Sequence, residues 1–414
     1  MNNLDMIFDG AKKASFVLST ASTEQKNNIL CSVAKAIRED MKSILSANET
    51  DIKNARENGM SEAMIDRLSL SEGKIEAIVN AIGKVADLSD PVGREAVTTR
   101  PNGLVIKKVS VPLGVVGIIY ESRPNVTVDA ACLCLKSGNV CILRGGKEAI
   151  NSNLAFCRAI RNALEKSGFP GECVNVISDT TRESAKALMT ANGKIDVLIP
   201  RGGKGLIQSV VENATVPVIE TGAGNCHVYV DESADLEMAN EICFNARAQR
   251  PSVCNSAENV LVHRNVAEKF LPMMQKKMQE KKVELRGCEK TLKILPGITL
   301  ATEEDFYTEY NDYILSVKVV KDVFEAVEHI NEHSTKHSEA IITENKENAD
   351  YFTSKIDSAA VYVNASTRFT DGEEFGLGAE IGISTQKMHA RGPMGLEALT
   401  TTKYVVIGNG QIRQ

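Results

Sequence analysis

Cys254 is the residue whose type and position most clearly suggest chemistry. It lies in the polar stretch QRPSVCNS, which contains a proline and leads directly into an apolar segment. The nucleophilic form of cysteine is the thiolate, and the neighbouring cation Arg250 and amide Asn255 give an electropositive setting that favours it. Upstream, Glu220 places a carboxylate at the end of the apolar segment VPVIE. A thiol and a carboxylate at two such loops are typical of an acyl-transfer site.

A second feature with chemical meaning is the segment PRGGKG, in which Gly202 and Gly203 follow an apolar run and open a predicted helix. Free backbone N–H groups and the helix dipole favour an anion at such a position. The glycines could also serve only a tight turn, because the chain lacks the G-x-G-x-x-G fingerprint of dinucleotide-binding folds. The sequence therefore leaves two interpretations of this segment open.

The elements that must position these residues are strands and helices in alternation. The first series of short apolar runs is GVVGIIY, VCILR, VNVI, VLIP and VPVIE, and the second, from about residue 247, is NVLVH, ILSVKVV, AIIT and AVYVN. Continuous apolar runs between helices predict an α/β fold with parallel sheets covered on both faces. Ligands in such sheets bind at the carboxyl ends of the strands. Glu220 ends one such strand, whereas the loop that carries Cys254 leads into the next.

Residues 94–111 differ from the rest of the chain. A polar strand, the turn RPNG and the strand LVIKKV predict a β-hairpin with little core of its own, and TTTKYVVIG near the C-terminus predicts a third strand of the same kind. An isolated hairpin is marginally stable in water. These strands therefore need a partner surface.

Composition limits the classes of function. At 414 residues the chain exceeds what one hydrophobic core usually serves, so we expect two or three lobes. A net charge of −6 with interspersed signs predicts binding of neither nucleic acid nor a membrane. Asp5 and Asp9 interrupt the apolar core that a signal peptide would need, so we expect a cytoplasmic protein with its cysteines as thiols. Five of them lie in apolar patterns that predict burial: Cys132, Cys134, Cys141, Cys157 and Cys243.

The chain resembles the aldehyde dehydrogenase superfamily, whose nucleophile and base have the order and separation of Cys254 and Glu220. The loops YESRPN and HARGPMGLE are similar to the branch that reduces L-glutamate 5-phosphate to L-glutamate 5-semialdehyde in proline biosynthesis. The resemblance implies an aldehyde dehydrogenase-like fold with two Rossmann-like parallel-sheet domains and a small β-hairpin oligomerisation arm. It implies a cofactor-binding domain over 1–246, interrupted by 94–111, a catalytic domain over 247–398, and an arm formed by 94–111 and 399–414.

The resemblance also implies a cofactor, NADP(H). Arg144 matches the position that contacts the cofactor ribose, and Lys147 falls where members that use NAD often carry glutamate, which favours a 2′-phosphate. Gly202 and Gly203 would meet the cofactor, and Glu309 resembles the glutamate that holds the nicotinamide ribose. The alternatives are an ordinary exposed lysine at 147 and a surface carboxylate at 309.

For catalysis, the resemblance implies that Cys254 forms a thioester with the acyl group of the substrate. The backbone N–H of Cys254 is one candidate donor to the oxyanion, and Ser122 and Asn125 are two candidates for the other, because YESRPN departs from the pattern of the superfamily. Glu220 would manage the thiol proton, activate water, or serve only as a strand-end cap.

Substrate contacts are expected from arginines, which bind carboxylate and phosphate in a bidentate manner. The candidates lie in the loops that carry the resemblance, with one amide beside the nucleophile: Arg123, Arg250, Arg391 and Asn255. The resemblance further implies a homo-oligomer and functional coupling to glutamate 5-kinase. No metal is expected, because Ser334 and Thr335 should end the helix before His337 can join His329 and His333 on one face.

Two other functions stay open from sequence. One is an aldehyde-oxidising or CoA-acylating dehydrogenase on the same scaffold, which the YESRPN and HARGPMGLE loops disfavour. The other is a non-enzymatic scaffold protein, which the joint presence of Cys254 and Glu220 disfavours.

Overall fold

We describe the protein from a computed structural model, in which residues 3–121 and 123–413 are described. The chain divides into two compact units. Unit 1 runs to Glu220 and adds Gly376–Gly382 and the segment from Met394 onward; unit 2 comprises Thr221–Phe375 and Ile383–Pro393. The two parallel sheets that we predicted are present, one in each unit, which confirms the fold class.

Unit 1 opens with five helices, α1 (Asn3–Leu18), α2 (Thr23–Glu39), α3 (Met41–Glu57), α4 (Glu62–Leu68) and α5 (Glu72–Asp87). Helix α2 begins at a capping box in which Ser22 and Gln25 satisfy each other's backbone N–H groups. Its apolar stripe, Ile29, Leu30, Val33 and Ile37, is fully buried. The helix therefore presents one apolar face to the core of unit 1.

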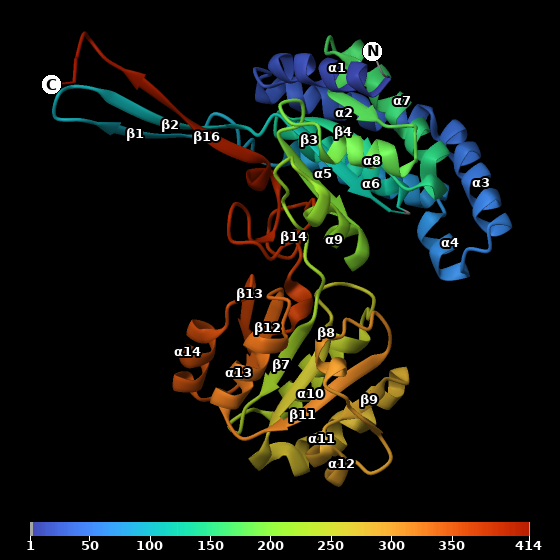
Figure 1. Ribbon diagram of the computed structural model, residues 1–414, viewed down its shortest axis with the longest axis vertical. Coiled ribbons are helices and arrows are strands. Elements are labelled where there is room, and N and C mark those ends of the chain that lie inside the picture. Colours follow the sequence, from blue (N-terminus) through green and yellow to red (C-terminus); the bar gives the residue numbers. More distant parts are fainter. Residues whose placement is uncertain (1–2, 122, 414) are drawn as a thin grey trace. The chain divides into compact units, whose positions relative to one another are not determined.

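The sheet of unit 1 has the strand order β5–β4–β3–β6, and all pairs are parallel. Its strands are β3 (Val115–Tyr120), β4 (Val140–Arg144), β5 (Val174–Val176) and β6 (Val197–Arg201). Between and after them lie α6 (Pro124–Lys136), η1 (Lys147–Ala149), α7 (Ile150–Lys166), η2 (Gly171–Cys173), α8 (Arg182–Met189) and α9 (Lys204–Asn213) (Figure 1). The strands are almost entirely buried, as the continuous apolar runs predicted.

The predicted strand VPVIE is wrong as a full strand. Only a single parallel bridge forms, between Leu198 and Val218. The N–H of Leu198 donates to the carbonyl of Pro217, and the N–H of Ile219 donates to the carbonyl of Leu198. Pro217 and Pro200 lack the N–H groups that would extend this ladder in either direction. The segment therefore lies beside β6 and ends at Glu220 without joining the sheet as a strand.

The sheet of unit 2 is larger, with the parallel order β10–β9–β11–β8–β7–β12–β13. Its strands are β7 (Cys226–Val230), β8 (Ala257–His263), β9 (Glu284–Gly287), β10 (Thr299–Leu300), β11 (Ile314–Val320), β12 (Ser338–Ile342) and β13 (Ala360–Val363). The helices are α10 (Leu236–Ala248), α11 (Arg264–Met278), η3 (Gln279–Lys281), α12 (Glu289–Ile294), η4 (Glu304–Tyr307), α13 (Val323–His333), α14 (Lys346–Lys355) and η5 (Thr367–Phe369). A small antiparallel pair, β14 (Ile383–Ser384) and β15 (Gly392–Pro393), completes the unit.

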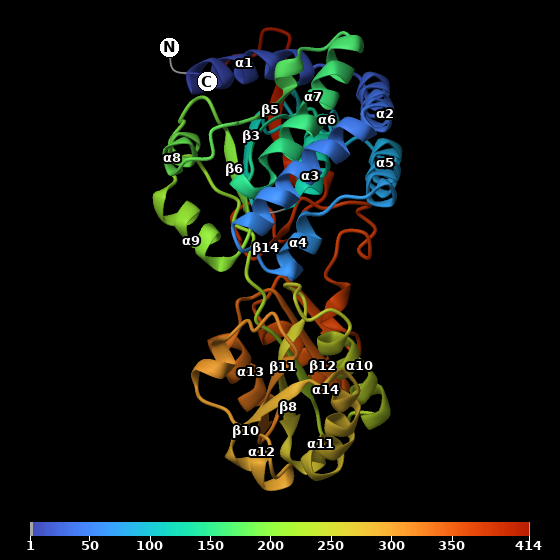
Figure 2. The ribbon, with the colours of Figure 1, turned by 90° about the vertical axis from the view of Figure 1, so that its right-hand side faces the viewer.

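Strand β7 shows how the two faces of this sheet are filled. Val228 and Val230 pack with residues of α10 and α11, whereas Tyr229 packs with residues of α13 and α14. Figure 2 shows helices of both groups around the sheet. Alternate residues of one strand thus serve two separate cores, so the strand is buried along its whole length.

The boundary between the units differs from the predicted one. We placed it at 246/247, but the chain passes from one unit to the other at 220/221. The reason is β7, which hydrogen-bonds to β8 and β12 and therefore belongs to the second sheet. The segment 221–246 thus joins the unit that carries Cys254.

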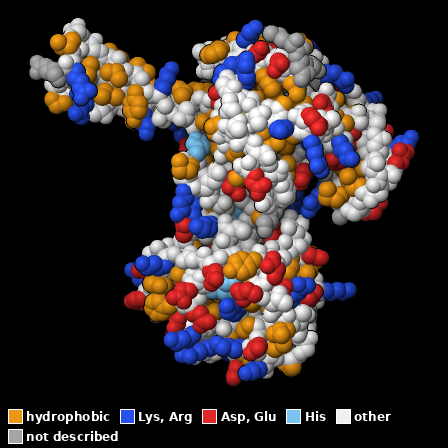
Figure 3. Space-filling model, in the orientation of Figure 1, with side chains coloured by type: hydrophobic (Ala, Val, Ile, Leu, Met, Phe, Trp, Pro, Cys, Tyr) orange, Lys and Arg blue, Asp and Glu red, His pale blue; other side chains and the backbone are white. Residues whose placement is uncertain are grey.

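The remaining strands form the predicted three-stranded antiparallel sheet, which we call the arm: β1 (Glu95–Thr99), β2 (Val105–Pro112) and β16 (Thr400–Ile407), the last preceded by η6 (Leu396–Leu399). Hydrophobic side chains are exposed on it, as Figure 3 shows in orange, among them Val97, Tyr404, Val406 and Ile407. The arm therefore has the uncovered apolar surface that its sequence predicted.

All ten cysteines are thiols, and the five that we expected to be buried are buried. Cys254 is only half-buried. Within the described ranges, no helix combines the length and the apolar character that crossing a membrane requires.

Candidate active site

Cys254 lies in a turn between the end of α10 and the start of β8. The helix ends before Pro251, which cannot continue it and restricts the residue that precedes it. The turn lies at the amino end of β8 and of its parallel neighbour β7, because Cys226 at the start of β7 pairs with Ala257 at the start of β8. This edge of the sheet is opposite to the one at which α/β sheets usually bind their ligands.

A second loop, Thr221–Asn225, lies directly against the backbone of Cys254. A Cβ atom built on Gly224 would lie 1.5 Å from the carbonyl oxygen of Cys254 and 2.7 Å from its Cα. Cys226 Sγ, at the start of β7, donates to the same carbonyl at 3.2 Å. The backbone of Cys254 is therefore fixed from outside its own loop, and only glycine fits at position 224.

Glu309 joins this arrangement. Its Oε1 accepts the backbone N–H of Gly224 at 2.9 Å, so the carboxylate is held next to the loop that contacts Cys254. Glu309 is half-buried. Its assignment to the nicotinamide ribose stays a prediction.

Asn255 is buried and bonded to the backbone of a neighbouring segment. Its Nδ2 donates to the carbonyls of Arg368, at 3.2 Å, and Thr370, at 2.9 Å, while Thr367 Oγ1 donates to the carbonyl of Asn255 at 2.7 Å. Because both amide protons are used, Asn255 holds η5 against the nucleophile loop in this structure. A direct substrate contact by Asn255 stays a prediction.

Arg250 is exposed, two residues beyond α10. Near it lies Arg368, which sequence reasoning missed; its Nε donates to Gln249 Oε1 at 3.0 Å. Burial lowers the pKa of Arg368, and the Arg250 charge lowers it further, whereas Cys254 raises it. Two guanidinium groups therefore lie near the loop that carries Cys254. The feature of the sequence that could have pointed to Arg368 was its position in the loop after β13.

Arg391 is held in an ion-pair cluster in unit 2. Its Nη2 donates to Asp357 Oδ1 and to the carbonyl of Asp357, each at 3.0 Å, and Lys336 and Lys387 also bind this carboxylate. The Lys387 hydrogen bond is the main cause that holds the pKa of Asp357 well below its usual range. In this structure Arg391 fixes the loop between β14 and β15, and its substrate contact stays a prediction.

In unit 1, the N-terminus of α9 carries the predicted anion site. Glu121 Oε2 accepts the N–H of Gly203 at 3.0 Å, and a Cβ on Gly202 would lie 2.7 Å from the carboxyl carbon of Glu121. A carboxylate thus occupies the position where the helix dipole favours negative charge. Sequence reasoning missed Glu121, although it belongs to the YESRPN loop that we singled out.

Arg144 and Lys147 follow β4. Arg144 Nη2 donates to the carbonyls of Thr180, at 2.6 Å, and Thr181, at 3.1 Å, and burial lowers the pKa of Arg144. Lys147 is exposed at the start of η1. Arg144 therefore supports the loop before α8, while Lys147 presents its charge to solvent.

The other predicted residues belong to the YESRPN loop and the end of unit 1. Ser122 lies outside the described residues. Arg123 is the N-cap residue of α6, and Asn125 Nδ2 donates to Asp129 Oδ2 at 2.9 Å. Glu220 is the last residue of unit 1 before the crossing to unit 2. The structure brings together Arg250, Cys254, Asn255 and Glu309 in unit 2, which also contains Arg391 on another loop. The other described candidates belong to unit 1.

Comparison with known proteins decides the family. The family model described as "Aldehyde dehydrogenase family" matches residues 2–305. The chain is 57% identical over 416 residues to "Gamma-glutamyl phosphate reductase" of Clostridium perfringens, with both chains covered completely. It is 59% identical over 404 residues to the protein of the same name from Carboxydothermus hydrogenoformans, with 97% of each chain covered. The chain belongs to the aldehyde dehydrogenase family. The crystal structure of gamma-glutamyl phosphate reductase from Thermotoga maritima matches it with a TM-score of 0.98, at 50% identity and with both chains fully covered.

This aldehyde dehydrogenase family member carries four of its six histidines close together in unit 2. The rings of His329 and His333 stack at 3.9 Å, and His227 lies 5.8 Å from His329. Lys318 Nζ donates to His329 Nδ1 at 3.0 Å. Burial, His227, Lys318 and His333 together lower the pKa of His329 to about 2, and burial lowers that of His337 to about 4. Asn225 links the cluster to the nucleophile loop through the carbonyls of Phe306 and His333.

The helix that carries His329 and His333 ends at Ser334, as predicted. Among the described residues, no group of three or more histidine, cysteine, aspartate or glutamate side chains has an arrangement that could hold a metal ion. The lysine that donates to His329 is a further reason against a cation there, because its own charge repels one.

Acid should lower the free energy of unfolding of this protein because of His329. A histidine with a pKa near 6.5 when unfolded takes up a proton below that pH, whereas folded His329 stays neutral, so stability is lost as pH falls below about 6.5. We expect wild type to lose about 1.4 kcal/mol more unfolding free energy than His329→Gln between about pH 7.5 and 5.5. Urea unfolding at both pH values measures this difference. Equal losses would show that folded His329 binds the proton.

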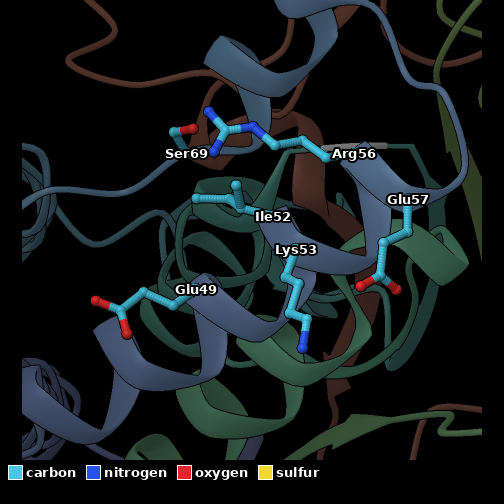
Figure 4. A pocket seen from close by; sticks show the side chains of 6 residues that line it. All are labelled: Glu49, Ile52, Lys53, Arg56, Glu57 and Ser69. Carbon is cyan, nitrogen blue, oxygen red and sulfur yellow. The ribbon is translucent and has the colours of Figure 1, made fainter.

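A surface cavity of about 460 Å³ lies on α3, lined by Glu49, Ile52, Lys53, Arg56, Glu57 and Ser69 (Figure 4). None of these residues is a predicted site residue. Its two cations and two carboxylates balance in charge, so the cavity does not select an anion. We assign no ligand to it.

Proposed function

We propose that the chain reduces L-glutamate 5-phosphate to L-glutamate 5-semialdehyde with NADPH and releases phosphate, as a step of proline biosynthesis. The observation that carries this proposal is the full-length identity of 57% to proteins named gamma-glutamyl phosphate reductase. The half-buried Cys254, fixed by Gly224 and Cys226, supplies a nucleophile suited to this reaction. The non-enzymatic alternative does not account for this arrangement.

The reaction begins at Cys254. Its thiolate attacks the acyl carbon of the substrate, a C–S bond forms, the C–O bond to phosphate breaks, and a thioester remains. The carbonyl oxygen carries negative charge in the tetrahedral species, and the backbone N–H of Cys254 is a candidate donor to it. One well-placed donor lowers such a barrier by roughly 3–4 kcal/mol. Ser122 and Asn125 are the two candidates for the second donor.

Glu220 is proposed to accept the thiol proton of Cys254 and later to return one to the product. In aldehyde oxidation this glutamate activates water. In a reductase, activated water would hydrolyse the thioester before it is reduced. The remaining alternative is a structural role at the end of the VPVIE segment. The arginines proposed to bind substrate are Arg123, Arg250 and Arg391, of which Arg250 is exposed beside the nucleophile loop.

The residues present fit NADPH. Glu121 shows that the α9 N-terminus accepts an anionic group. When bound, NADPH supplies the hydride that reduces the thioester. Glu309, held by Gly224, is proposed to bind the nicotinamide ribose.

The assay runs in the reverse direction. We expect L-glutamate 5-semialdehyde to reduce NADP⁺ only when inorganic phosphate is present, because phosphate must cleave the thioester. Reduction without phosphate would favour an aldehyde-oxidising dehydrogenase, and reduction with coenzyme A in place of phosphate would favour a CoA-acylating one. Either result would overturn the proposal.

Charge reversal at Lys147 should separate the two nicotinamide cofactors. If Lys147 binds the 2′-phosphate, Lys147→Glu should weaken NADPH binding by about 1.5–3 kcal/mol and leave NADH nearly unchanged. Lys166→Glu, at the other end of the following helix α7, is the matched control. Apparent constants for both cofactors measure the effect. Equal changes for NADPH and NADH would place the 2′-phosphate elsewhere.

The protein is further proposed to act in the cytoplasm as a homo-oligomer. The arm exposes apolar side chains on an open sheet, and such a surface is typical of one that meets another chain. A second copy of this chain is the proposed partner. Functional coupling to glutamate 5-kinase is proposed because that enzyme supplies the acyl phosphate.

A further inference from the structure

A buried ion pair lies directly beside the nucleophile loop. Arg247, in α10, and Glu258, in β8, have fully buried side chains, and Arg247 Nη1 lies 2.6 Å from Glu258 Oε2. Burial of two charges is costly, so such a pair is often no more stabilising than apolar side chains of similar volume. A role in placing other groups accounts better for this pair than stability does.

Arg247 contacts the residues that follow the nucleophile. Its Nη1 also donates to Ser256 Oγ at 3.3 Å and to the carbonyl of Ala257 at 3.1 Å. Ser256 Oγ in turn donates to the carbonyl of Ala246 at 3.0 Å. These bonds tie the end of α10 to the start of β8, and the loop that carries Cys254 spans the two. The guanidinium of Arg247 therefore holds the two ends of that loop together.

The same guanidinium reaches the segment that carries Glu309. Arg247 Nη2 donates to the carbonyl of Asp312. Glu309 holds Gly224, which lies against the Cys254 backbone. The fork of arginine is rigid and planar, so bonds from its two terminal nitrogens fix two segments relative to one another. One side chain thus sets the spacing between the nucleophile loop and the Glu309 segment.

Glu258 holds the fork in place and interacts with the same segment. Burial raises the pKa of Glu258 to about 7, with Arg247 opposing the rise and Glu309 adding to it. The backbone N–H of Tyr310 also bonds to this carboxylate. The Arg247–Glu258 pair therefore contacts both the loop that carries Cys254 and the segment that carries Glu309.

We propose that Arg247, held by Glu258, is a positioning residue that fixes Cys254 relative to Glu309. The inference rests on the proposed function for the roles of Cys254 and Glu309. Arg247 is fully buried, so it acts through these two residues and does not meet the substrate.

Two variants test the proposal. Arg247→Lys keeps the charge and loses the fork. Arg247→Met with Glu258→Leu removes both charges, so that no buried charge is left unpaired. The matched control is Lys26→Met with Asp90→Leu, which removes another nearly buried ion pair, in unit 1, with Nζ 2.5 Å from Oδ2. The melting temperatures of wild type, both Arg247 variants and the control are compared first.

The measurements are turnover per titrated Cys254 and the pH profile of Cys254 alkylation by iodoacetamide. Cys31 and Cys288, which are not buried, are changed to serine in every protein so that alkylation reports on one thiol. For both Arg247 variants we expect kcat to fall at least about tenfold, with KM for L-glutamate 5-semialdehyde changed less than about threefold, and alkylation to slow. The control should keep wild-type kcat and alkylation.

Several results would overturn the proposal. Wild-type kcat and alkylation in a folded Arg247 variant would show that the pair is only structural, even with a lower melting temperature. Failure of both Arg247 variants to fold would assign the pair to stability. Absence of phosphate-dependent activity in wild type would count against the proposed function instead, and alkylation alone would then decide the role of Arg247.

Discussion

Replacing Cys254 with alanine is expected to lower turnover by at least about 10⁴-fold, because removal of a covalent nucleophile leaves only binding and electrostatic contributions. Folding and NADPH binding should be unchanged, since the side chain is half-buried and its backbone is held by Gly224 and Cys226. Phosphate-dependent reduction of NADP⁺ measures the first effect, and a cofactor titration the second.

Cys288→Ala is the matched control for Cys254→Ala. Cys288 is also half-buried, and although burial raises the pKa of its thiol, hydrogen bonds from Thr291 and the Val319 N–H outweigh this and leave it lowered. It is thus, like Cys254, a half-buried thiol of unit 2. We expect full activity in Cys288→Ala. Substantial activity in Cys254→Ala together with its loss in Cys288→Ala would reverse the assignment of the nucleophile.

Gly224→Ala is expected to have the second largest effect, although the residue has no side chain to do chemistry. A Cβ at 1.5 Å from the Cys254 carbonyl oxygen cannot be relieved by a side-chain rotation, because the contact is with backbone. The loop must move, and a displacement of about 1 Å at a reacting group can cost about 10²-fold in rate. We expect kcat to fall by about that factor or more. The Glu309 contact should be lost with it.

Gly83→Ala in α5 is the control for the glycine change, since a Cβ there meets nothing within 4 Å and alanine favours a helix. It should keep full activity and melt at the same temperature or higher. A Gly224→Ala protein with wild-type turnover would mean that the two loops separate without cost, and would refute the view that Gly224 places Cys254.

Sequence reasoning predicted the features that local patterns determine. Continuous apolar runs predicted β3, β4, β8 and β11, and Ser334 ends α13 as expected. It also predicted that Cys254, unlike the buried cysteines, lies in an accessible loop. These features depend on residues close together in the chain, so no knowledge of distant partners was needed.

Features that depend on distant partners escaped prediction. The partners of β7 are β8 and β12, and no local pattern shows that this strand belongs to the second sheet. The ion pair of Arg391 with Asp357, 34 residues away, was likewise not predicted. Glu121 and Arg247 were unremarked for the same reason, because their contacts with Gly203 and Asp312 join segments far apart in sequence.

The division of the chain has a consequence for how the protein is made. The polypeptide crosses between the units at 220/221, 375/376, 382/383 and 393/394, and β16 pairs with β2 along its whole length. During synthesis from the N-terminus, β2 therefore leaves the ribosome long before its partner, while the sheet of unit 2 has all its strands once residue 363 has emerged. Synthesis of unit 1 therefore begins first and is completed last. Chaperones would bind nascent chains in which the sheet of unit 2 is complete and the exposed arm still lacks β16.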